Sequence, residues 1–371
     1  MDMTGHQLAA STSFAEAPAT IGGQAGRSTA TDENSTSSSR ADKEIILSVQ
    51  NLEVSFKTFG GEVQAIRGVT FDLYKGETLA VVGESGCGKS VTANTIMGLI
   101  PQPPGRIRNG QVLFKEKDLT KLSKRALRDI QGVDISMIFQ DPMTALNPTL
   151  KIGEQLMEGV RTHHKVSKAE ARRKAVEMLD LVGISNPEER LGQYPHQFSG
   201  GMRQRIVIAI ALICEPELLI ADEPTTALDV TIQAQILELF AEIQRKTGVA
   251  IILITHDLGV VAKIADRIAV MYAGKIIEIG NKREIFYDPQ HPYTQGLLNS
   301  VPRLDLQEEE LQPIDGTPPD LFAPPEGCPF AARCPFAMEV CERVYPASTQ
   351  LTEQHTVDCW LQDARAKAVF S

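Results

Sequence analysis

The octapeptide GESGCGKS, residues 83–90, has the residue types and spacing of a phosphate-binding loop. It fits the pattern G-x-x-x-x-G-K-[ST] and lies between stretches that predict a strand and a helix. Its glycines let successive backbone N–H groups point at phosphate oxygens, and the following helix adds its positive N-terminal end. Lys89 should reach the β- and γ-phosphates, and Ser90 should ligate Mg²⁺. The expected nucleotide contacts are Gly83, Glu84, Ser85, Gly86, Cys87, Gly88, Lys89, Ser90 and Val91.

The stretch LLIADEP, residues 218–224, adds two adjacent carboxylates. An apolar strand would carry Asp222 to its carboxyl end, where ligands of open α/β sheets bind. Asp222 is therefore expected to hold Mg²⁺, directly or through water. Glu223 could polarise the water that attacks the γ-phosphate. The alternative is that Glu223 serves only in the outer shell of the magnesium ion.

Four of the six cysteines lie near the carboxyl end, at Cys328, Cys334, Cys341 and Cys359. Their spacing fits neither the paired pattern of common zinc sites nor the tight ferredoxin run. Spacing alone therefore names no metal. The segment is rich in proline and poor in core-forming residues, so a metal clip would stabilise it. An iron–sulfur cluster, zinc, free thiols and disulfides all remain open at this point.

Strands and helices alternate along residues 44–285, and this alternation predicts an α/β core with a mainly parallel sheet. The apolar runs at residues 78–82, 218–222 and 250–255 are expected to be strands covered on both faces. Residues 233–248 predict an amphipathic helix that ends at Gly248.

Three other segments differ from this core. A helical insertion is expected from about residue 141 to 214, where Ser167 and Glu170 are spaced as a capping box. Residues 1–43 are rich in Ser, Thr, Ala and Gly and predict a disordered leader. Proline, glycine and cysteine accumulate after residue 285, so residues 286–371 are expected to form a second, small Cys-rich domain.

Composition excludes several classes of protein. The chain has 371 residues and a formal net charge of -10, which argues against nucleic acid as its main partner. No run approaches the roughly 18 apolar residues of a membrane-spanning helix. The first ten residues lack the basic end and apolar centre of a secretion signal, so we expect the chain to stay in the cytoplasm.

Taken with the two phosphate motifs, FSGGMRQR at residues 198–205 resembles the signature of ATP-binding-cassette (ABC) proteins. Other family elements follow in order: Gln140 as the Q-loop residue, ALD at 227–229 as the D-loop, and His256 as the switch histidine. The resemblance implies that Gln140 and His256 act in hydrolysis with Lys89 and Glu223, and that Gln140 also serves the Mg²⁺ site. It further implies a P-loop NTPase fold, with a RecA-like core sheet, an antiparallel β part and the helical insertion.

The resemblance also implies a shared active site. Two cassettes pair head to tail in this family, and each signature closes over the nucleotide of the other chain. Ser199, Gly200, Gly201, Gln204 and Asp229 are therefore expected at the partner's nucleotide. Adenine is expected to stack on Phe59, with Phe56 as second choice, and the alternative for either side chain is a place in the core.

Longer stretches resemble the ATP-binding subunits of oligopeptide and dipeptide importers, with the oligopeptide type favoured. They include MIFQDPMTALNP and YPHQFSGGMRQR in the cassette, and DPQHPYTQGLLNSVP and GCPFAARCPFAMEVC beyond it. This implies ATP-driven oligopeptide uptake at the cytoplasmic face of the membrane. The implied partners are a second homologous ATPase chain, two membrane permease subunits and an extracytoplasmic peptide-binding protein. The resemblance also implies a [4Fe–4S] cluster held by the four C-terminal cysteines.

Two alternatives have a different function. One is a soluble ABC ATPase of DNA repair or translation, and the other is a dipeptide- or nickel-type importer subunit. A catalytically silent, regulatory cassette is disfavoured because Lys89, Asp222, Glu223 and His256 are all present.

Overall fold

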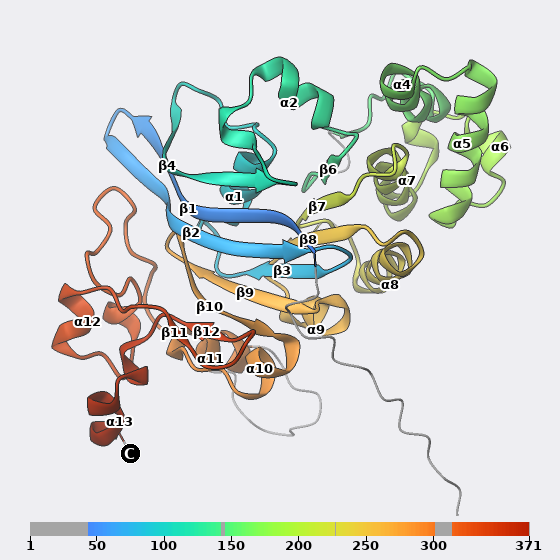
Figure 1. Ribbon diagram of the computed structural model, residues 1–371. Coiled ribbons are helices and arrows are strands. Elements are labelled where there is room, and N and C mark those ends of the chain that lie inside the picture. The colour runs from blue at the N-terminus through green and yellow to red at the C-terminus, as the bar shows by residue number, and fades with distance from the viewer. Residues whose placement is uncertain (1–43, 142–144, 227, 301–313, 371) are drawn as a thin grey trace, which may run out of the picture. The chain divides into compact units, whose positions relative to one another are not determined.

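The computed structural model describes residues 44–141, 145–226, 228–300 and 314–370 (Figure 1). All of them belong to one compact unit, Ser39–Ser371. The expected disordered leader, residues 1–43, and Ala227 of the predicted D-loop lie outside the described residues. Within the described ranges, no helix combines the length and apolar character needed to cross a bilayer.

The core sheet has the mainly parallel order that the alternating pattern predicts. Its parallel strands are, in spatial order, β6 (Ile135–Ile138), β7 (Leu218–Asp222), β8 (Ala250–Thr255), β3 (Thr78–Val82) and β9 (Arg267–Tyr272). The bounds of β3, β7 and β8 match the predicted apolar runs, and every residue in them is buried. Continuous burial explains the lack of alternation, because layers cover both faces of this sheet.

An antiparallel sheet and helix α1 (Lys89–Ile96) cover one face of the core sheet. This second sheet contains β2 (Gly61–Tyr74), β1 (Ile45–Thr58), β4 (Gly105–Phe114) and β5 (Lys117–Asp118), in that order. Ala93 and Ile96 of α1 share a core with Leu79 and Val81 of β3 and with residues of β1 and β4. The short helices η2 (Leu119–Lys121) and α2 (Lys124–Ile130) then lead to β6. The predicted antiparallel part is thus a layer that holds α1 against the core sheet.

The segment between β6 and β7 is helical, as predicted. It contains α4 (Ile152–His164), α5 (Lys168–Leu181), α6 (Pro187–Arg190), η3 (Pro195–Gln197) and α7 (Gly200–Leu212), and α4 to α6 lie far from the C-terminal elements in Figure 1. The Ser167 hydroxyl caps α5 by accepting the Glu170 N–H at 3.2 Å, as the capping motif predicts. Helix α8 (Val230–Thr247) ends at Gly248 with a φ of 71°, the left-handed stop expected there.

The C-terminal region, here the described residues after 285, packs directly on the rest of the chain. After α9 (Leu258–Ile264) and β9, strand β10 (Lys275–Asn281) pairs antiparallel with β9 and with β12 (Thr356–Val357), and β11 (Thr349–Gln350) lies outermost. Tyr293 and Phe330 share a core with Ala80 and Val82 of β3. The remaining elements are α10 (Lys282–Tyr287), α11 (Pro292–Asn299), η4 (Ala331–Arg333), α12 (Glu339–Arg343), η5 (Trp360–Gln362) and α13 (Ala364–Phe370). Within the described residues, the separate Cys-rich domain expected from the sequence is therefore not seen, because this region completes a shared sheet and core.

A buried carboxylate fastens the C-terminal region to β10. Glu278 is 1% exposed and accepts the backbone N–H groups of Gln290 and His291 at 2.7 and 3.0 Å. His355 Nε2 lies 2.8 Å from Glu278 Oε1. Burial alone would lower the pKa of His355, but its hydrogen bond and charge interaction with Glu278 outweigh burial and raise it.

We expect His355→Gln to destabilise the chain by about 1 kcal/mol at acidic pH, because a positively charged donor to the Glu278 carboxylate is replaced by a neutral amide. The raised folded-state pKa makes this contribution complete below the usual histidine pKa of about 6.5 and removes it as pH rises through the folded value. Urea unfolding at several pH values measures the difference between the variant and the wild type. The exposed His163→Gln in α4 is the matched control, and a difference that does not fall with rising pH would contradict the assignment.

Candidate nucleotide-binding site

The predicted phosphate-binding loop connects β3 to α1, and at two of its positions only glycine fits. A Cβ at Gly83, which has a φ of 153°, would lie 2.1 Å from the Met271 carbonyl oxygen. A Cβ at Gly88, with a φ of 109°, would lie 2.7 Å from the Ala65 carbonyl oxygen. Only glycine fits so close to a neighbouring backbone in these conformations. Gly88 is the N-cap of α1, so the free N–H groups of that helix open toward the loop.

A cavity of about 450 Å³ lies beside this loop. It is lined by Ala65, Ser85, Gly86, Gly88, Lys89, Ser90, Val91, Gln140, Glu223 and His256. The predicted contacts Gly83, Glu84 and Cys87 are described residues that do not line it. Lys89 is 5% exposed, and its Nζ donates to the carbonyl oxygens of Gly83 and Glu84 at 2.8 and 3.0 Å. The loop therefore holds one positive charge against a cavity of a size that suits a small ligand.

Two of the three predicted Mg²⁺ ligands, Ser90 and Asp222, lie side by side. The Ser90 hydroxyl, in the first turn of α1, donates at 3.0 Å to Oδ1 of Asp222, the last residue of β7. Asp222 is 7% exposed, and burial raises the pKa of its carboxyl group, although the hydrogen bond from Ser90 opposes the shift. A divalent cation at this point would favour the charged carboxylate, since an opposite charge nearby lowers a carboxyl pKa. A hydroxyl and a carboxylate oxygen, completed by water and phosphate oxygens, suit Mg²⁺.

Glu223 lies at the carboxyl end of β7, close to residues that follow β6 and β8. Its Oε2 accepts hydrogen bonds from Gln140 Nε2 at 3.2 Å and from Thr226 Oγ1 at 2.9 Å. Its Oε1 lies 3.4 Å from His256 Nδ1. Glu223 has a φ of 46°, and its N–H donates to the Ile254 carbonyl oxygen at 2.9 Å, which holds this unusual backbone conformation in place. The predicted Gln140, Glu223 and His256 are thus brought together, while Thr226 and the lining residue Ala65 were not predicted.

The residues of the predicted ABC signature, 198–205, do not line this cavity. Ser199 caps α7 by accepting the Met202 N–H at 3.4 Å, and both Ser199 and Gly200 are exposed. Asp229 caps α8 in the same way, through the Ile232 N–H at 3.0 Å, and is exposed as well. Among the described residues that line the cavity, none comes from residues 198–205 or is Asp229. Ser199, Gly200 and Asp229 are therefore exposed and do not line the cavity of their own chain.

Two predicted nucleotide contacts need correction or qualification. Gln204 is fully buried, and its Nε2 donates to the Pro224 carbonyl oxygen at 2.7 Å. This placement argues against the predicted contact with nucleotide. Instead, the hydrogen bond of Gln204 connects α7 to the segment that follows Asp222. Phe59 is fully exposed at the turn between β1 and β2 but does not line the cavity, so its role with adenine stays a prediction. Phe56, the second choice, packs partly buried against the core.

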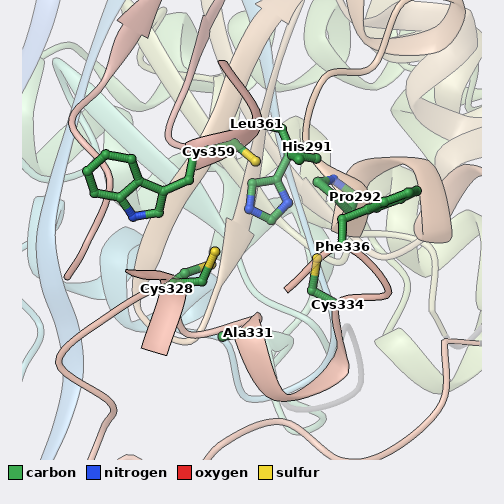
Figure 2. Close-up of a pocket in the computed structure, with 10 residues that line it drawn as sticks. His291, Pro292, Cys328, Ala331, Cys334, Phe336, Cys359 and Leu361 are labelled. Carbon is green, nitrogen blue, oxygen red and sulfur yellow. The ribbon is translucent and has the colours of Figure 1, made fainter. Parts of the chain in front are cut away.

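A second cavity gathers the C-terminal thiols. Cys328, Cys334, Cys341 and Cys359 line one cavity of about 20 Å³, and Figure 2 shows three of their sulfur atoms around the His291 ring. All four are free thiols. Burial raises the pKa of Cys328 to about 11 and that of Cys359 to about 12, so burial favours the neutral form of these two thiols. Within the described residues, no three His, Cys, Asp or Glu side chains are grouped tightly enough to hold a single metal ion.

His291 supplies an unsatisfied donor to this second cavity. The ring is 1% exposed, and its Nδ1 accepts the Tyr293 N–H at 3.0 Å. The proton must therefore lie on Nε2, for which the described part of the chain offers no hydrogen-bond partner. A buried donor without a partner is costly, so its presence beside four thiols indicates an acceptor that belongs in the cavity.

Comparisons with known proteins agree with the geometry of the nucleotide site. Residues 66–226 match the family model for the ABC transporter, and residues 277–341 match that for the oligopeptide/dipeptide transporter C-terminal region. The dipeptide transport ATP-binding protein of Bacillus subtilis (strain 168) is 71% identical over 329 residues, which cover 88% of this chain and 98% of that protein. The oligopeptide transport ATP-binding protein of the same organism is 60% identical over 317 residues, covering 85% and 88%. A solved dimeric bacterial ABC transporter cassette superposes with a TM-score of 0.57 at 27% identity, over 64% of this chain and 99% of that one.

These matches include both parts of the chain, the phosphate-binding core and the segment that carries the first three C-terminal cysteines. The higher of the two identities is to a dipeptide transport protein, so the preference for the oligopeptide type gains no support. The extent of the identity establishes the family. The chain is an ATPase that belongs to the ABC transporter ATP-binding proteins with the oligopeptide/dipeptide transporter C-terminal region.

Proposed function

We propose that this ATPase powers the uptake of peptides through a membrane importer. The names of its relatives and the C-terminal family match support peptides as the cargo, with dipeptides and oligopeptides both admitted. The observation that carries the proposal is the convergence of Gln140, Glu223 and His256 on the cavity that Lys89 and Ser90 line.

Each residue has a definite task in this proposal. The N–H groups of the loop and Lys89 bind the phosphates, and Ser90, Asp222 and Gln140 would hold Mg²⁺. When bound, Mg²⁺ neutralises charge that develops on the transferred phosphoryl group. The Glu223 carboxylate takes a proton from the attacking water, and Gln140 and His256 fix the orientation of this carboxylate.

The site is completed by a second ATPase chain, which we propose to be a homologous subunit in a heterodimer. The exposed Ser199 and Gly200 lie at the start of α7, where free N–H groups and the helix dipole attract an anion such as a γ-phosphate. The dimeric form of the solved ABC cassette supports this pairing. Two membrane permease subunits and an extracytoplasmic peptide-binding protein complete the proposed importer, with this chain peripheral at the cytoplasmic face.

Glu223→Gln is expected to keep ATP binding and to slow hydrolysis by at least about 100-fold, because the amide cannot accept the proton of the attacking water. Steady-state phosphate release and binding of a fluorescent ATP derivative measure the two effects. Glu238→Gln, an exposed glutamate on α8, should behave as wild type. Hydrolysis by Glu223→Gln at the normal rate would show that another group is the base.

We further propose that Cys328, Cys334, Cys341 and Cys359 hold a [4Fe–4S] cluster. Four thiols on one cavity supply the donor set that this cluster requires. The orphaned Nε2–H of His291 has the chemistry to donate to a cluster sulfur. When bound, the cluster would supply a cross-link and a redox centre to the C-terminal region.

Protein purified without oxygen is expected to be brown and to contain about four iron and four labile sulfide per chain. Cys334→Ser should lose both, because one of four ligands is removed, whereas Cys214→Ser, in the core beside α7, should retain both. Colorimetric iron and sulfide assays make the comparison. Colourless protein that contains zinc would refute the cluster.

A further inference from the structure

An ion pair connects the phosphate-binding loop to the cysteine-lined region. Glu84 is the second residue of the loop, and Arg333 is the last residue of η4, directly before Cys334. The Arg333 guanidinium donates to both carboxylate oxygens of Glu84, from Nη1 to Oε2 at 2.8 Å and from Nη2 to Oε1 at 3.0 Å. Such a two-bond pair fixes orientation as well as distance.

The rest of the guanidinium is equally constrained. Nη1 also donates to the Tyr272 hydroxyl at 3.1 Å, while Nη2 and Nε donate to the carbonyl oxygens of Ile314 and Asp315 at 3.0 and 2.8 Å. The Arg333 side chain is only 6% exposed. All five N–H donors of an arginine are thus used, and a lysine could not replace this arrangement. Arg333 therefore holds Glu84 from a rigid position in the C-terminal region.

The backbone of Glu84 is held from the same side. Its N–H donates to the Tyr293 hydroxyl at 2.9 Å, and its carbonyl oxygen accepts the Lys89 Nζ at 3.0 Å. Tyr293 is fully buried and packs against the rings of Tyr272 and Phe330, with centroids 4.5 and 5.4 Å away. The residue that fixes the position of the Lys89 ammonium group is therefore itself fixed by Tyr293 and Arg333.

We propose that Arg333 and Tyr293 are positioning residues that keep the Gly83–Val91 loop in its ATP-binding form, so that the packing of the cysteine-lined region sets the affinity for ATP. The inference rests on the proposed role of this loop in binding ATP. A glycine-rich loop has little side-chain packing of its own, and holding it in the bound conformation removes an ordering cost from binding. Arg333 and Tyr293 touch neither Asp222 nor Glu223 in the described contacts, so the chemical step itself should be spared.

The test measures binding and turnover separately in the full-length chain. Arg333→Met and Tyr293→Phe should weaken binding of Mg²⁺ with a non-hydrolysable ATP analogue, by about tenfold and threefold, measured by titration calorimetry. Arg333→Lys should restore part of the loss. The KM for ATP should rise by similar factors, while kcat of the assembled transporter at saturating ATP stays within about twofold of wild type, as for a loss of uniform binding. Arg343→Met is the matched control, because Arg343 pairs with Glu339 on the exposed surface of the same region.

A double-mutant cycle isolates the pair. If Glu84 and Arg333 act together, Glu84→Gln with Arg333→Met should weaken binding no more than the worse of the single variants. Unchanged affinity in both Arg333→Met and Tyr293→Phe would overturn the inference. Should the Arg333 variants fail to fold, Tyr293→Phe alone decides, because it keeps the ring packing and removes one oxygen. Failure of the wild-type chain to bind the analogue would instead contradict the proposed role of the loop.

Discussion

A loop that binds phosphate with its backbone must leave N–H groups unpaired, so its conformation has to be imposed by its neighbours. Three sets of contacts hold the loop in this chain. The Met271 and Ala65 carbonyl oxygens lie so close to Gly83 and Gly88 that they leave no room for a Cβ. Lys89 Nζ, in the loop itself, donates to the carbonyl oxygens of Gly83 and Glu84. Arg333 and Tyr293 hold the outer residue Glu84. Gln140, Glu223 and His256 line the same cavity as this loop.

The same constraint explains the placement of the C-terminal region. Its residues share a core with β3, the strand that leads into the loop, and its strand β12 extends the core sheet beyond β10. If the packing of this region loosened, the phosphate-binding loop would be affected through the contacts of Arg333 and Tyr293 with Glu84. A redox centre among its cysteines would lie one residue away from the arginine that holds Glu84. The region thus contributes to the nucleotide site without lining its cavity.

Local patterns predicted the parts of the fold that depend on local physics. The bounds of β3, β7 and β8 follow from continuous apolar runs, and the end of α8 follows from Gly248. Glu223 was predicted from its place directly after an apolar strand, whereas Gln140 and His256 were predicted only through the resemblance to ABC proteins, whose motifs follow in the same order along this chain.

Contacts between distant segments were not predicted, because no local pattern encodes them. Arg333 and Glu84 are 249 positions apart, and neither belongs to a periodic pattern that indicates its partner. The burial of Gln204 was missed for a related reason. A polar residue in a signature motif suggests a surface contact, but its amide satisfies a buried carbonyl of Pro224. The Arg333–Glu84 pair and the burial of Gln204 both depend on tertiary packing.

One chain holds the catalytic base and the phosphate-binding loop, and in the proposed importer a second chain supplies the surface that closes over ATP. This division of the site can be tested by comparing ATP turnover between a strictly monomeric preparation and the assembled transporter at equal site concentration. We expect the monomer to bind ATP but to hydrolyse it at least about 100-fold more slowly, a loss within the range of a missing group of phosphate-binding N–H donors. Equal turnover per site in the monomer and the assembly would contradict it.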